Sequence, residues 1–392
     1  MLGLEKTRPV WVEINLDHLA YNMRQIRKTV HKDIKVGAVI KADGYGHGAV
    51  EIADTLLENG AQWLIVATLS EAVQLRKKYK EVPILILGYT PNEVAEVVIE
   101  NELSQTVYNL SQAQYYNDIA KKLCKKVKIH IKIDTGMNRL GFQPNDDSIK
   151  TIKKISNLSN VMIEGMFTHF AAADQLDKSF TQIQYNRFED VFKSLQREGV
   201  SIPIKHVGNS AAIMDLPSMH LDMVRAGIIL YGLYPSNEVN MESLTLKPVL
   251  SVKARITHVK NVDEGVGIGY GLTYSTSKSS KIATLPVGYA DGFTRMLSGK
   301  GEVLVKGHKV PIVGRICMDQ CMINVTVLDE IHSNDEVILI GSDGKNSISA
   351  DDIAKKLDTI NYEIVCMIGR RVPRVYIKDQ KIIKIKDYLL SE

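Results

Sequence analysis

Short β-rich runs alternate with longer amphipathic runs over residues 36–232 of this 392-residue chain. We expect strands at residues 36–40, 63–68, 83–88, 105–108, 127–134, 161–168, 203–207 and 223–227. Helical patterns lie between most of them, for example at residues 49–58, 70–79 and 179–198. Eight strands with intervening helices predict a parallel sheet, and their number and length favour a closed (β/α)8 TIM-type barrel. The open doubly wound alternative needs a dinucleotide-type first turn, whose third glycine would fall at Ala49.

The pattern changes after Pro235. Short strand-like runs with turn residues between them occupy residues 247–262, 281–286, 301–305, 309–313, 321–327 and 336–341, and one helical run covers 349–357. This pattern predicts a mainly antiparallel β domain. The chain is therefore of the α/β class, with a barrel domain at residues 1–240 and a C-terminal β domain at 241–392. A strand within residues 1–14 precedes the barrel and fits either domain.

The composition is that of an ordinary soluble protein, with 24% charged and 45% hydrophobic residues and a net charge of +4. The sequence has no concentrated basic run and no apolar run of membrane-spanning length, so we expect neither nucleic acid nor membrane as a partner. The four cysteines lack metal-ligand spacing, so we expect no metal site and a reduced, cytoplasmic protein.

Unusual polar residues fall where the predicted barrel strands end, which is where active sites of such barrels lie. They are Lys41, Thr168, His169, Asn209, Ser210, Arg225 and Gly227. Each has a plainer interpretation as well. His169 is compatible with a hydrogen-bonded core histidine, and Ser210 with a simple helix N-cap. A helix N-terminus is also a place where a phosphate binds, so the two interpretations of Ser210 agree.

The first of these strand ends is the most informative. An apolar strand ends in Lys41, and a glycine-rich turn containing Tyr45 follows it. This places an amine at the mouth of a buried strand, beside backbone that an anion can approach closely. A lysine needs this arrangement to hold pyridoxal phosphate as a Schiff base, although a strand-end lysine is more often a solvated loop residue.

The fifth predicted strand alternates strictly between apolar and polar residues. Its isoleucines should face the surrounding helices, so Lys128, His130 and Lys132 should face the barrel interior. An unpaired charge is costly there, so Lys132 needs an acidic partner such as Asp134 or a chemical change that removes its charge. Arg139 follows closely and adds a second cation.

Several segments in the same order along the chain resemble the alanine racemase family, and the resemblance covers nearly the whole chain. The matching segments are VIKADGYGHG (39–48), HIKIDTGMNRLG (130–141), EGMFTHFAAAD (164–174), HVGNSAA (206–212), MVRAGIILYG (223–232), GIGYGLTY (267–274), PVGYADG (286–292), VGRICMDQ (313–320) and TINYE (359–363). The fold of that family, a (β/α)8 barrel followed by a β domain, agrees with the strand pattern.

The resemblance implies a role for each matching residue. Lys41 would form the Schiff base and serve as one catalytic acid/base, with Tyr270 as the other on the opposite face of the cofactor. Lys132 would be a candidate for carbamylation and would pair with Arg139. The remaining cofactor residues would be Tyr45, Arg139, His169, Asn209, Ser210, Arg225, Gly227, Ile228 and Tyr362. Arg139 and Met318 would bind substrate, and Asp174, Arg295, Arg315 and Ile360 would line the access channel.

The sequence departs from the family pattern at a few positions. Asp43 and Gly44 replace the usual asparagine and alanine, Asn138 replaces a glycine, and Arg370 stands where a tyrosine or another polar residue is common. None removes a catalytic group. The resemblance further implies a homodimer with active sites shared between the two subunits.

The predicted function is therefore interconversion of L- and D-alanine, which supplies D-alanine for peptidoglycan. A racemase with serine or broad specificity is the close alternative. A decarboxylase on a related barrel and a barrel-only cofactor-binding protein are more distant ones. The two-base reaction also places a demand on its acid/base residues. Lysine and tyrosine have reference pKa values of about 10.4 and about 10, so the pKa of each residue must be lowered for the reaction to run near neutral pH.

Overall fold

The computed structural model describes residues 7–390 and divides them into two compact units. The barrel unit contains residues 19–44 and 49–247. The β unit contains residues 7–18, 45–48 and 248–390. Each unit is therefore assembled from segments that are distant in the sequence.

The barrel unit is built on one sheet in which every neighbouring pair of strands is parallel, in the order β8-β7-β6-β5-β4-β3-β2-β9. Its strands are β2 (Lys35–Val39), β3 (Trp63–Val66), β4 (Ile84–Ile86), β5 (Ser104–Val107), β6 (Val127–Lys132), β7 (Val161–Phe167), β8 (Ile204–His206) and β9 (Met223–Ala226). All the predicted barrel strands are present, with ends that differ by at most two residues.

Backbone hydrogen bonds join the two strands at the ends of this order. The Asp222 N–H donates to the Lys205 carbonyl and the Arg225 N–H donates to the Gly208 carbonyl, at 3.1 and 3.0 Å. The sheet thus curls until β8 meets β9. The predicted (β/α)8 architecture is confirmed as a nearly closed barrel.

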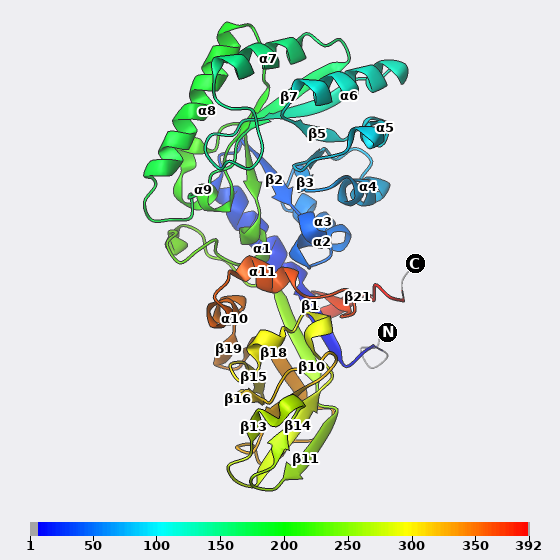
Figure 1. The fold of residues 1–392 in the computed structure, drawn as a ribbon, viewed down its shortest axis with the longest axis vertical. Helices are drawn as coiled ribbons and strands as arrows, with labels where there is room; N and C mark the ends of the chain where they lie inside the picture. The colour runs from blue at the N-terminus through cyan, green and yellow to red at the C-terminus, as the bar shows by residue number, and fades with distance from the viewer. Residues whose placement is uncertain (1–6, 391–392) are drawn as a thin grey trace. The chain divides into compact units, whose positions relative to one another are not determined.

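Helices surround this sheet (Figure 1). They are α1 (Leu16–Thr29), α3 (Ala49–Glu58), α4 (Leu69–Lys78), α5 (Ala95–Glu100), α6 (Leu110–Lys122), α7 (Asp146–Ser156), α8 (Ser179–Arg197) and α9 (Ser210–Asp215). Because helices cover one face of the sheet and packed side chains fill the other, strands such as β3 are buried along their whole length.

The β unit contains a mainly antiparallel sheet in the order β11-β14-β17-β16-β15-β18-β10-β1-β20-β21, with β19 beside β18. The strands are β1 (Val10–Asn15), β10 (Leu250–Arg255), β11 (His258–Val262), β14 (Ser280–Leu285), β15 (Glu302–Val305), β16 (His308–Val313), β17 (Cys321–Asn324), β18 (Glu336–Asp343), β19 (Asn346–Ile348), β20 (Arg374–Lys378) and β21 (Lys381–Lys386). Strands β12 (Gly267–Ile268) and β13 (Tyr274–Ser275) form a separate hairpin, and helices α10 (Ala350–Leu357) and α11 (Asn361–Cys366) complete the unit.

Strand β1, which the sequence left open, lies in this second sheet. It pairs antiparallel with β10 and parallel with β20. The β20–β21 hairpin and α11 were not predicted from the sequence. Strand β21 reads KIIKIK, and most of its side chains are exposed, so the usual signal of a half-buried strand is absent.

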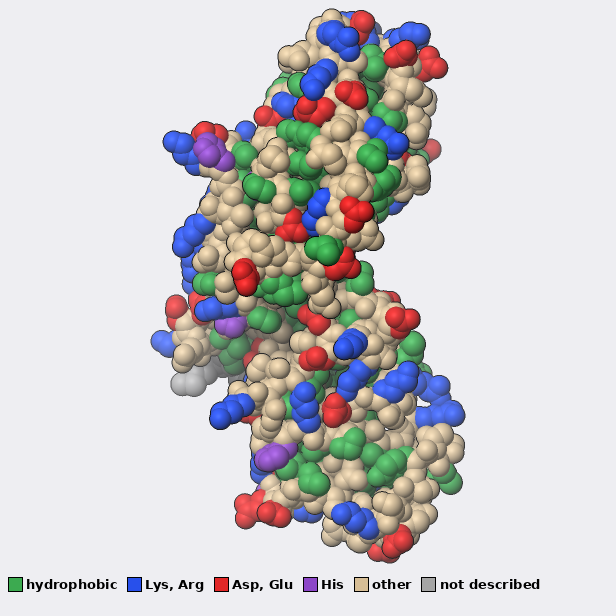
Figure 2. All heavy atoms as spheres, turned by 90° about the vertical axis from the view of Figure 1, so that its left-hand side faces the viewer, with side chains coloured by type: hydrophobic (Ala, Val, Ile, Leu, Met, Phe, Trp, Pro, Cys, Tyr) green, Lys and Arg blue, Asp and Glu red, His purple; other side chains and the backbone are tan. Residues whose placement is uncertain are grey.

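Charged side chains of both signs are mixed over the face shown in Figure 2, as the small net charge of +4 suggests. Within residues 7–390, no helix combines the length and the apolar character that crossing a bilayer requires.

A left-handed turn, labelled α2 (Lys41–Tyr45), follows β2. Four consecutive residues have positive φ, namely Ala42 at 52°, Asp43 at 53°, Gly44 at 64° and Tyr45 at 52°. For residues other than glycine, this conformation costs about 1–2 kcal/mol each. The surrounding structure must therefore hold the turn in place.

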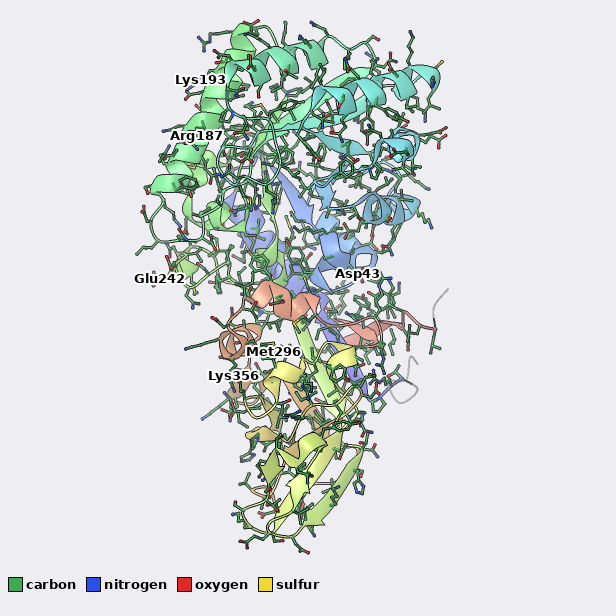
Figure 3. All side chains as sticks on the ribbon, viewed as in Figure 1. Asp43, Arg187, Lys193, Glu242, Met296 and Lys356 are labelled. Carbon is green, nitrogen blue, oxygen red and sulfur yellow. The ribbon has the colours of Figure 1, made fainter. Side chains whose placement is uncertain are left out.

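Two carboxylates hold this turn. The Glu71 side chain, at the start of α4, accepts the Ala42 N–H at 2.6 Å. The Asp43 side chain, labelled in Figure 3, accepts the Ala49 N–H at 2.9 Å, where α3 begins. The glycine at position 44 and the aspartate at position 43 thus both suit the turn, since aspartate tolerates left-handed geometry and glycine adopts it freely.

Residues 45–48 continue from the turn into the β unit, where a buried arginine binds them. The Arg374 guanidinium is 2% exposed and donates to the carbonyl of Gly46 at 3.1 Å. It also donates to the carbonyls of Gly369, Val372 and Ile368, at 2.6, 2.6 and 2.7 Å. One side chain thus joins this short segment to the loop that precedes β20.

We expect Arg374→Leu to lower the free energy of unfolding by at least about 2 kcal/mol, because buried carbonyls left without donors cost about 1–3 kcal/mol each. Urea denaturation measures the effect. The control is Lys378→Leu, which removes an exposed cation from the same strand. Equal losses in both variants would contradict this assignment.

We expect Gly44→Ala to destabilise the protein by about 1–3 kcal/mol, because the new Cβ adds backbone strain and crowding. That Cβ would lie 2.8 Å from Ile52 Cδ1, whereas at Gly199, with φ of +72°, the nearest atom would be Lys153 Nζ at 3.8 Å. Gly199→Ala is therefore a control that adds backbone strain without crowding of the new Cβ. A loss at Gly44 no larger than that at Gly199 would show that the turn is not tightly packed.

Candidate active site

The structure brings five of the predicted residues together at the carboxyl end of the barrel. The His169 imidazole follows β7, and its pKa lies well below its usual range. The first cause is burial, and the others are the positive charges of Arg225, Arg139, Lys132 and Lys41. Four cations therefore act on one neutral ring.

Arg225 on β9 is the most enclosed of these cations, at 3% exposure. Its Nη1 donates to the His206 carbonyl at 2.8 Å and to His206 Nδ1 at 2.9 Å. Its Nη2 donates to the carbonyls of Thr168 and Val207, at 2.9 and 3.2 Å, and to His169 Nδ1 at 3.2 Å. Burial and the charge of Arg139 lower its pKa to about 9.

These hydrogen bonds fix the protonation of His169. A guanidinium has only donors, so His169 Nδ1 must accept from Arg225. The neutral ring then carries its proton on Nε2. In the part of the chain that the structure describes, Arg225 Nε takes no part in these hydrogen bonds, so one N–H of the guanidinium remains for a ligand.

Lys132 faces the barrel interior, as the alternation predicted. Its Nζ donates to the Ile133 carbonyl at 2.9 Å and lies 5.4 Å from the centre of the Phe167 ring. Its pKa falls to about 7, first because of burial and then because of Arg225, while Asp134 acts in the opposite direction. Within residues 7–390, Lys132 makes no ion pair with an acid. The charge of this buried lysine is therefore not neutralised by an acidic partner such as Asp134.

The loop after β6, which carries Arg139, is held from two sides. Asp134 Oδ1 accepts the Asn138 N–H at 2.9 Å. Arg187 on α8, labelled in Figure 3, donates to the Thr135 carbonyl at 2.8 Å. Asn138 has a φ of +56°, which explains why glycine is usual there and why asparagine is tolerated. The Arg139 side chain itself is exposed.

Two helix starts come together beside the seam of the barrel. The Asn209 side chain caps α9 by accepting the Ala212 N–H at 3.0 Å. The Ser210 Oγ accepts the Gly227 N–H at 3.0 Å, and Ile228 begins the 3-10 turn η4 (Ile228–Tyr231). Backbone N–H groups at the first turns of helices favour anionic ligands.

In the β unit, Tyr45 lies beside Tyr362 of α11, with ring centroids 6.1 Å apart and an angle of 51° between the rings. Tyr45 is buried, and its pKa is raised first by burial and then by Tyr362 and Cys366. These two predicted cofactor residues are therefore neighbours.

Tyr270 stands in the turn η6 (Tyr270–Leu272) between β12 and β13, with its side chain 70% exposed. Gly269 and Gly271 on either side have φ of +73° and +70°. A Cβ at Gly271 would lie 3.8 Å from the Arg315 guanidinium carbon, so Arg315 flanks this turn. The glycines give the turn its shape and leave the tyrosine projecting from it.

The other predicted residues of the β unit also lie at its surface. Met318 is 53% exposed; the Cys317 carbonyl accepts the N–H of residue 289, and the Met318 carbonyl accepts the N–H of residue 290. Arg295 begins the 3-10 turn η8 (Arg295–Leu297) and is exposed, as is Ile360 at the N-cap of α11. Asp174, in the barrel unit, is half-buried.

The sequence missed His206, which bonds Arg225 directly, and did not connect His130 with it. His206 Nε2 lies 2.8 Å from His130 Nδ1, and both rings are fully buried. The inward alternation of β6 marked His130 as an interior residue. No comparable signal marked His206 on the three-residue strand β8.

The site therefore combines a strand-end amine with two buried cations, Arg225 and Lys132, that form no direct ion pair with an acid within residues 7–390. Such a set suits a ligand with anionic oxygens and a ring nitrogen that accepts a hydrogen bond. The residues thus fit pyridoxal phosphate on the chemistry of their donors.

Comparison with known proteins agrees with this geometry. Residues 14–235 match the profile described as "Alanine racemase, N-terminal domain", and residues 249–376 match "Alanine racemase, C-terminal domain". Alanine racemase 1 of Clostridium acetobutylicum is 49% identical over 382 residues, which cover 97% of this chain and 99% of that protein.

Solved structures give the same result. The alanine racemase structure from Clostridium difficile 630 has a TM-score of 0.95 and 49% identity, covering 98% of this chain and all of the other. The alanine racemase of Bartonella henselae with covalently bound pyridoxal phosphate has a TM-score of 0.84 and 30% identity over 94% of this chain and 99% of that one. The chain described here therefore belongs to the alanine racemase family.

Proposed function

We propose that this protein interconverts L-alanine and D-alanine with pyridoxal phosphate as cofactor. The observation that carries the proposal is the strand-end Lys41 near the hydrogen-bonded Arg225–His169 pair, in a chain related to alanine racemases over nearly its full length. The bound cofactor supplies an electron-withdrawing ring that acidifies the Cα–H bond of the amino acid.

The residues of the chain would hold that cofactor by distinct contacts. Lys41 would provide the amine that bonds the cofactor covalently, and Arg225 would donate its Nε–H to the ring nitrogen. Because arginine has only donors and stays protonated, the ring nitrogen would remain unprotonated. The residues that would hold the phosphate are Tyr45, Asn209, Ser210, Gly227, Ile228 and Tyr362, while His169 would contact the ring and Arg139 would bond the phenolic oxygen.

Racemisation requires removal of a proton from one face of Cα and delivery of another to the opposite face. We assign these two roles to Lys41 and Tyr270. His169 supports the tyrosine, because its Nδ1 is occupied by Arg225 and its Nε2–H is left as a donor to the Tyr270 oxygen. Such a hydrogen bond would stabilise the phenolate form of the tyrosine.

Substrate binding falls to the Met318 amide and Arg139, and the tyrosine at position 362 restricts the site to small side chains. Asp174, Arg295, Arg315 and Ile360 are assigned to the access channel. We further propose a homodimer whose active sites are shared between subunits, located in the cytoplasm, where D-alanine is made for peptidoglycan.

The first test is to incubate the protein and pyridoxal phosphate with L-alanine, L-serine and L-lysine separately and to resolve the products by chiral chromatography. We expect alanine to approach an equal mixture while serine and lysine change little. Comparable turnover of serine or lysine would overturn the choice of alanine. No racemisation despite a bound cofactor would favour a decarboxylase or a cofactor-binding protein.

We expect Tyr270→Phe to lower racemisation by about 10²–10⁴-fold, the usual contribution of a positioned acid/base. With Lys41 still present, one alanine enantiomer should keep exchanging its Cα proton with D2O without inversion, as measured by proton NMR. Tyr115→Phe, at an exposed tyrosine on α6, is the control. Loss of exchange from both enantiomers in Tyr270→Phe would contradict the assignment of one face of Cα to Lys41 and the other to Tyr270.

Lys132 is proposed to carry a carbamate that pairs with Arg139. A pKa of about 7 leaves much of the amine neutral, and only the neutral amine reacts with carbon dioxide. Protein equilibrated with ¹³C-bicarbonate should give a carbamate ¹³C NMR signal that strengthens as the pH rises through about 7. The signal should be absent in Lys132→Gln and present in Lys126→Gln, a control at an exposed lysine.

A further inference from the structure

We propose that Glu164, at the amino end of the barrel, is a positioning residue for Arg225 and acts on it through two buried histidines. The inference rests on the proposed function, in which Arg225 directs its Nε–H at the cofactor. Glu164 lies in β7, and Arg225 lies at the carboxyl end of β9. None of Glu164, His130 and His206 has a role in the reaction proposed above.

A continuous hydrogen-bond chain joins these residues through the barrel. Arg225 Nη1 lies 2.9 Å from His206 Nδ1, and His206 Nε2 lies 2.8 Å from His130 Nδ1. His130 Nε2 lies 3.3 Å from Glu164 Oε2. We call these four residues the Arg225–Glu164 chain.

The direction of the chain follows from its two ends. Arginine can only donate and an ionised carboxylate can only accept. Each neutral histidine between them must accept at Nδ1 and donate from Nε2. With a donor at Arg225 and an acceptor at Glu164, a single arrangement of protons satisfies all three hydrogen bonds.

The charges support this arrangement. Burial lowers the pKa of His130 and of His206, and the charge of Arg225 acts in the same direction on both, so the two rings are neutral. Lys132 adds to this effect on His206, while Glu164 partly opposes it on His130.

At the far end, the pKa of Glu164 is lowered because hydrogen bonds from His130 and Ser104 outweigh its burial. Lys128, half-exposed, lies 3.7 Å from Glu164 Oε1 and favours the ionised carboxylate as well. Within residues 7–390, no carboxylate forms an ion pair with Arg225, so the ionised Glu164 is the acid that terminates its hydrogen-bond network.

Local features of β7 make room for the chain. Ile129 pairs with Ile163 and His130 pairs with Gly165, so Glu164 is an extra residue between them. Such a bulge re-aims a side chain. A Cβ at Gly165 would lie 2.5 Å from His130 Nδ1 and 2.7 Å from the Ile204 carbonyl, so only glycine leaves space for the imidazole.

Aromatic rings fix the two imidazoles. Phe167 stacks on His206 at 4.8 Å with an angle of 5° between the rings. Trp63 packs edge-on against His130 at 5.5 Å. The rings are therefore held in the orientation that the hydrogen bonds require, which distinguishes an ordered chain from loosely packed interior histidines.

The direct test is ¹⁵N NMR of the cofactor-loaded protein labelled only in its histidines, since long-range couplings to the ring protons distinguish Nδ1–H from Nε2–H. We expect His130 and His206 both to be neutral with the proton on Nε2. An Nδ1–H form or a charged ring at either position would overturn the proposal. This measurement requires no substitution and no turnover, so it is independent of whether alanine is the substrate.

Two variants then distinguish the loss of the hydrogen-bond acceptor from a change in side-chain shape. Glu164→Gln keeps an oxygen for the His130 Nε2–H, whereas Glu164→Leu removes it and leaves that donor buried without a partner. We expect Glu164→Leu to alter the imidazole protonation of His206 and to raise the Kd for pyridoxal phosphate about tenfold, equivalent to about 1.4 kcal/mol. Glu164→Gln should leave the protonation of both imidazoles unchanged. Its Kd for pyridoxal phosphate should change by less than about threefold, well below the tenfold change expected for Glu164→Leu.

Lys128→Gln is the matched control, because it removes the half-exposed cation beside Glu164 and leaves the acceptor in place. It should behave as the unaltered protein in both measurements. Equal cofactor affinity and equal imidazole protonation in Glu164→Leu and Glu164→Gln would contradict a positioning role, whatever the change in melting temperature.

Discussion

The burial of one positive charge, that of Arg225, constrains both the barrel and its candidate site. Taking a guanidinium out of water is costly unless its donors are satisfied. Here the acceptors are the carbonyls of Thr168, His206 and Val207, at the ends of β7 and β8. Strand β8 is short and shares few backbone hydrogen bonds with β9, so the side chain that we propose orients the ligand also joins the strands where the barrel closes.

The electrostatics of the site follow from this arrangement. Arg225 and Arg139 both lower the pKa of Lys132, Arg139 lowers the pKa of Arg225, and all three cations lower the pKa of His169. Cations that repel one another in a buried site favour any anion that enters it. The proposed phosphate, phenolic oxygen, substrate carboxylate and carbamate on Lys132 would all supply negative charge at this end of the barrel. They would therefore relieve a repulsion that the folded chain already contains.

The sequence predicted the parts of this site that obey simple periodicity. Alternation in β6 placed Lys132 in the interior, and the strand ends identified Lys41, His169 and Arg225. It missed the link from Arg225 to Glu164, because the bulge at Glu164 interrupts the two-residue period of β7 and no local pattern marks His206. It also missed the β20–β21 hairpin, whose lysines hide the strand signal. The left-handed turn at residues 42–45 depends on Glu71, which is distant in sequence.

The position of the acid also has a physical reason. A carboxylate in direct contact with Arg225 would take donors from the guanidinium and would offer a second acceptor at the place proposed for the ring nitrogen. Placing the carboxylate two imidazoles away leaves the Nε–H of Arg225 available while still fixing the direction of the hydrogen bonds behind it. Neutral histidines suit this task because each one accepts at one nitrogen and donates from the other. Under this proposal, Glu164 at one end of the barrel fixes the orientation of Arg225 at the other end through the two histidines.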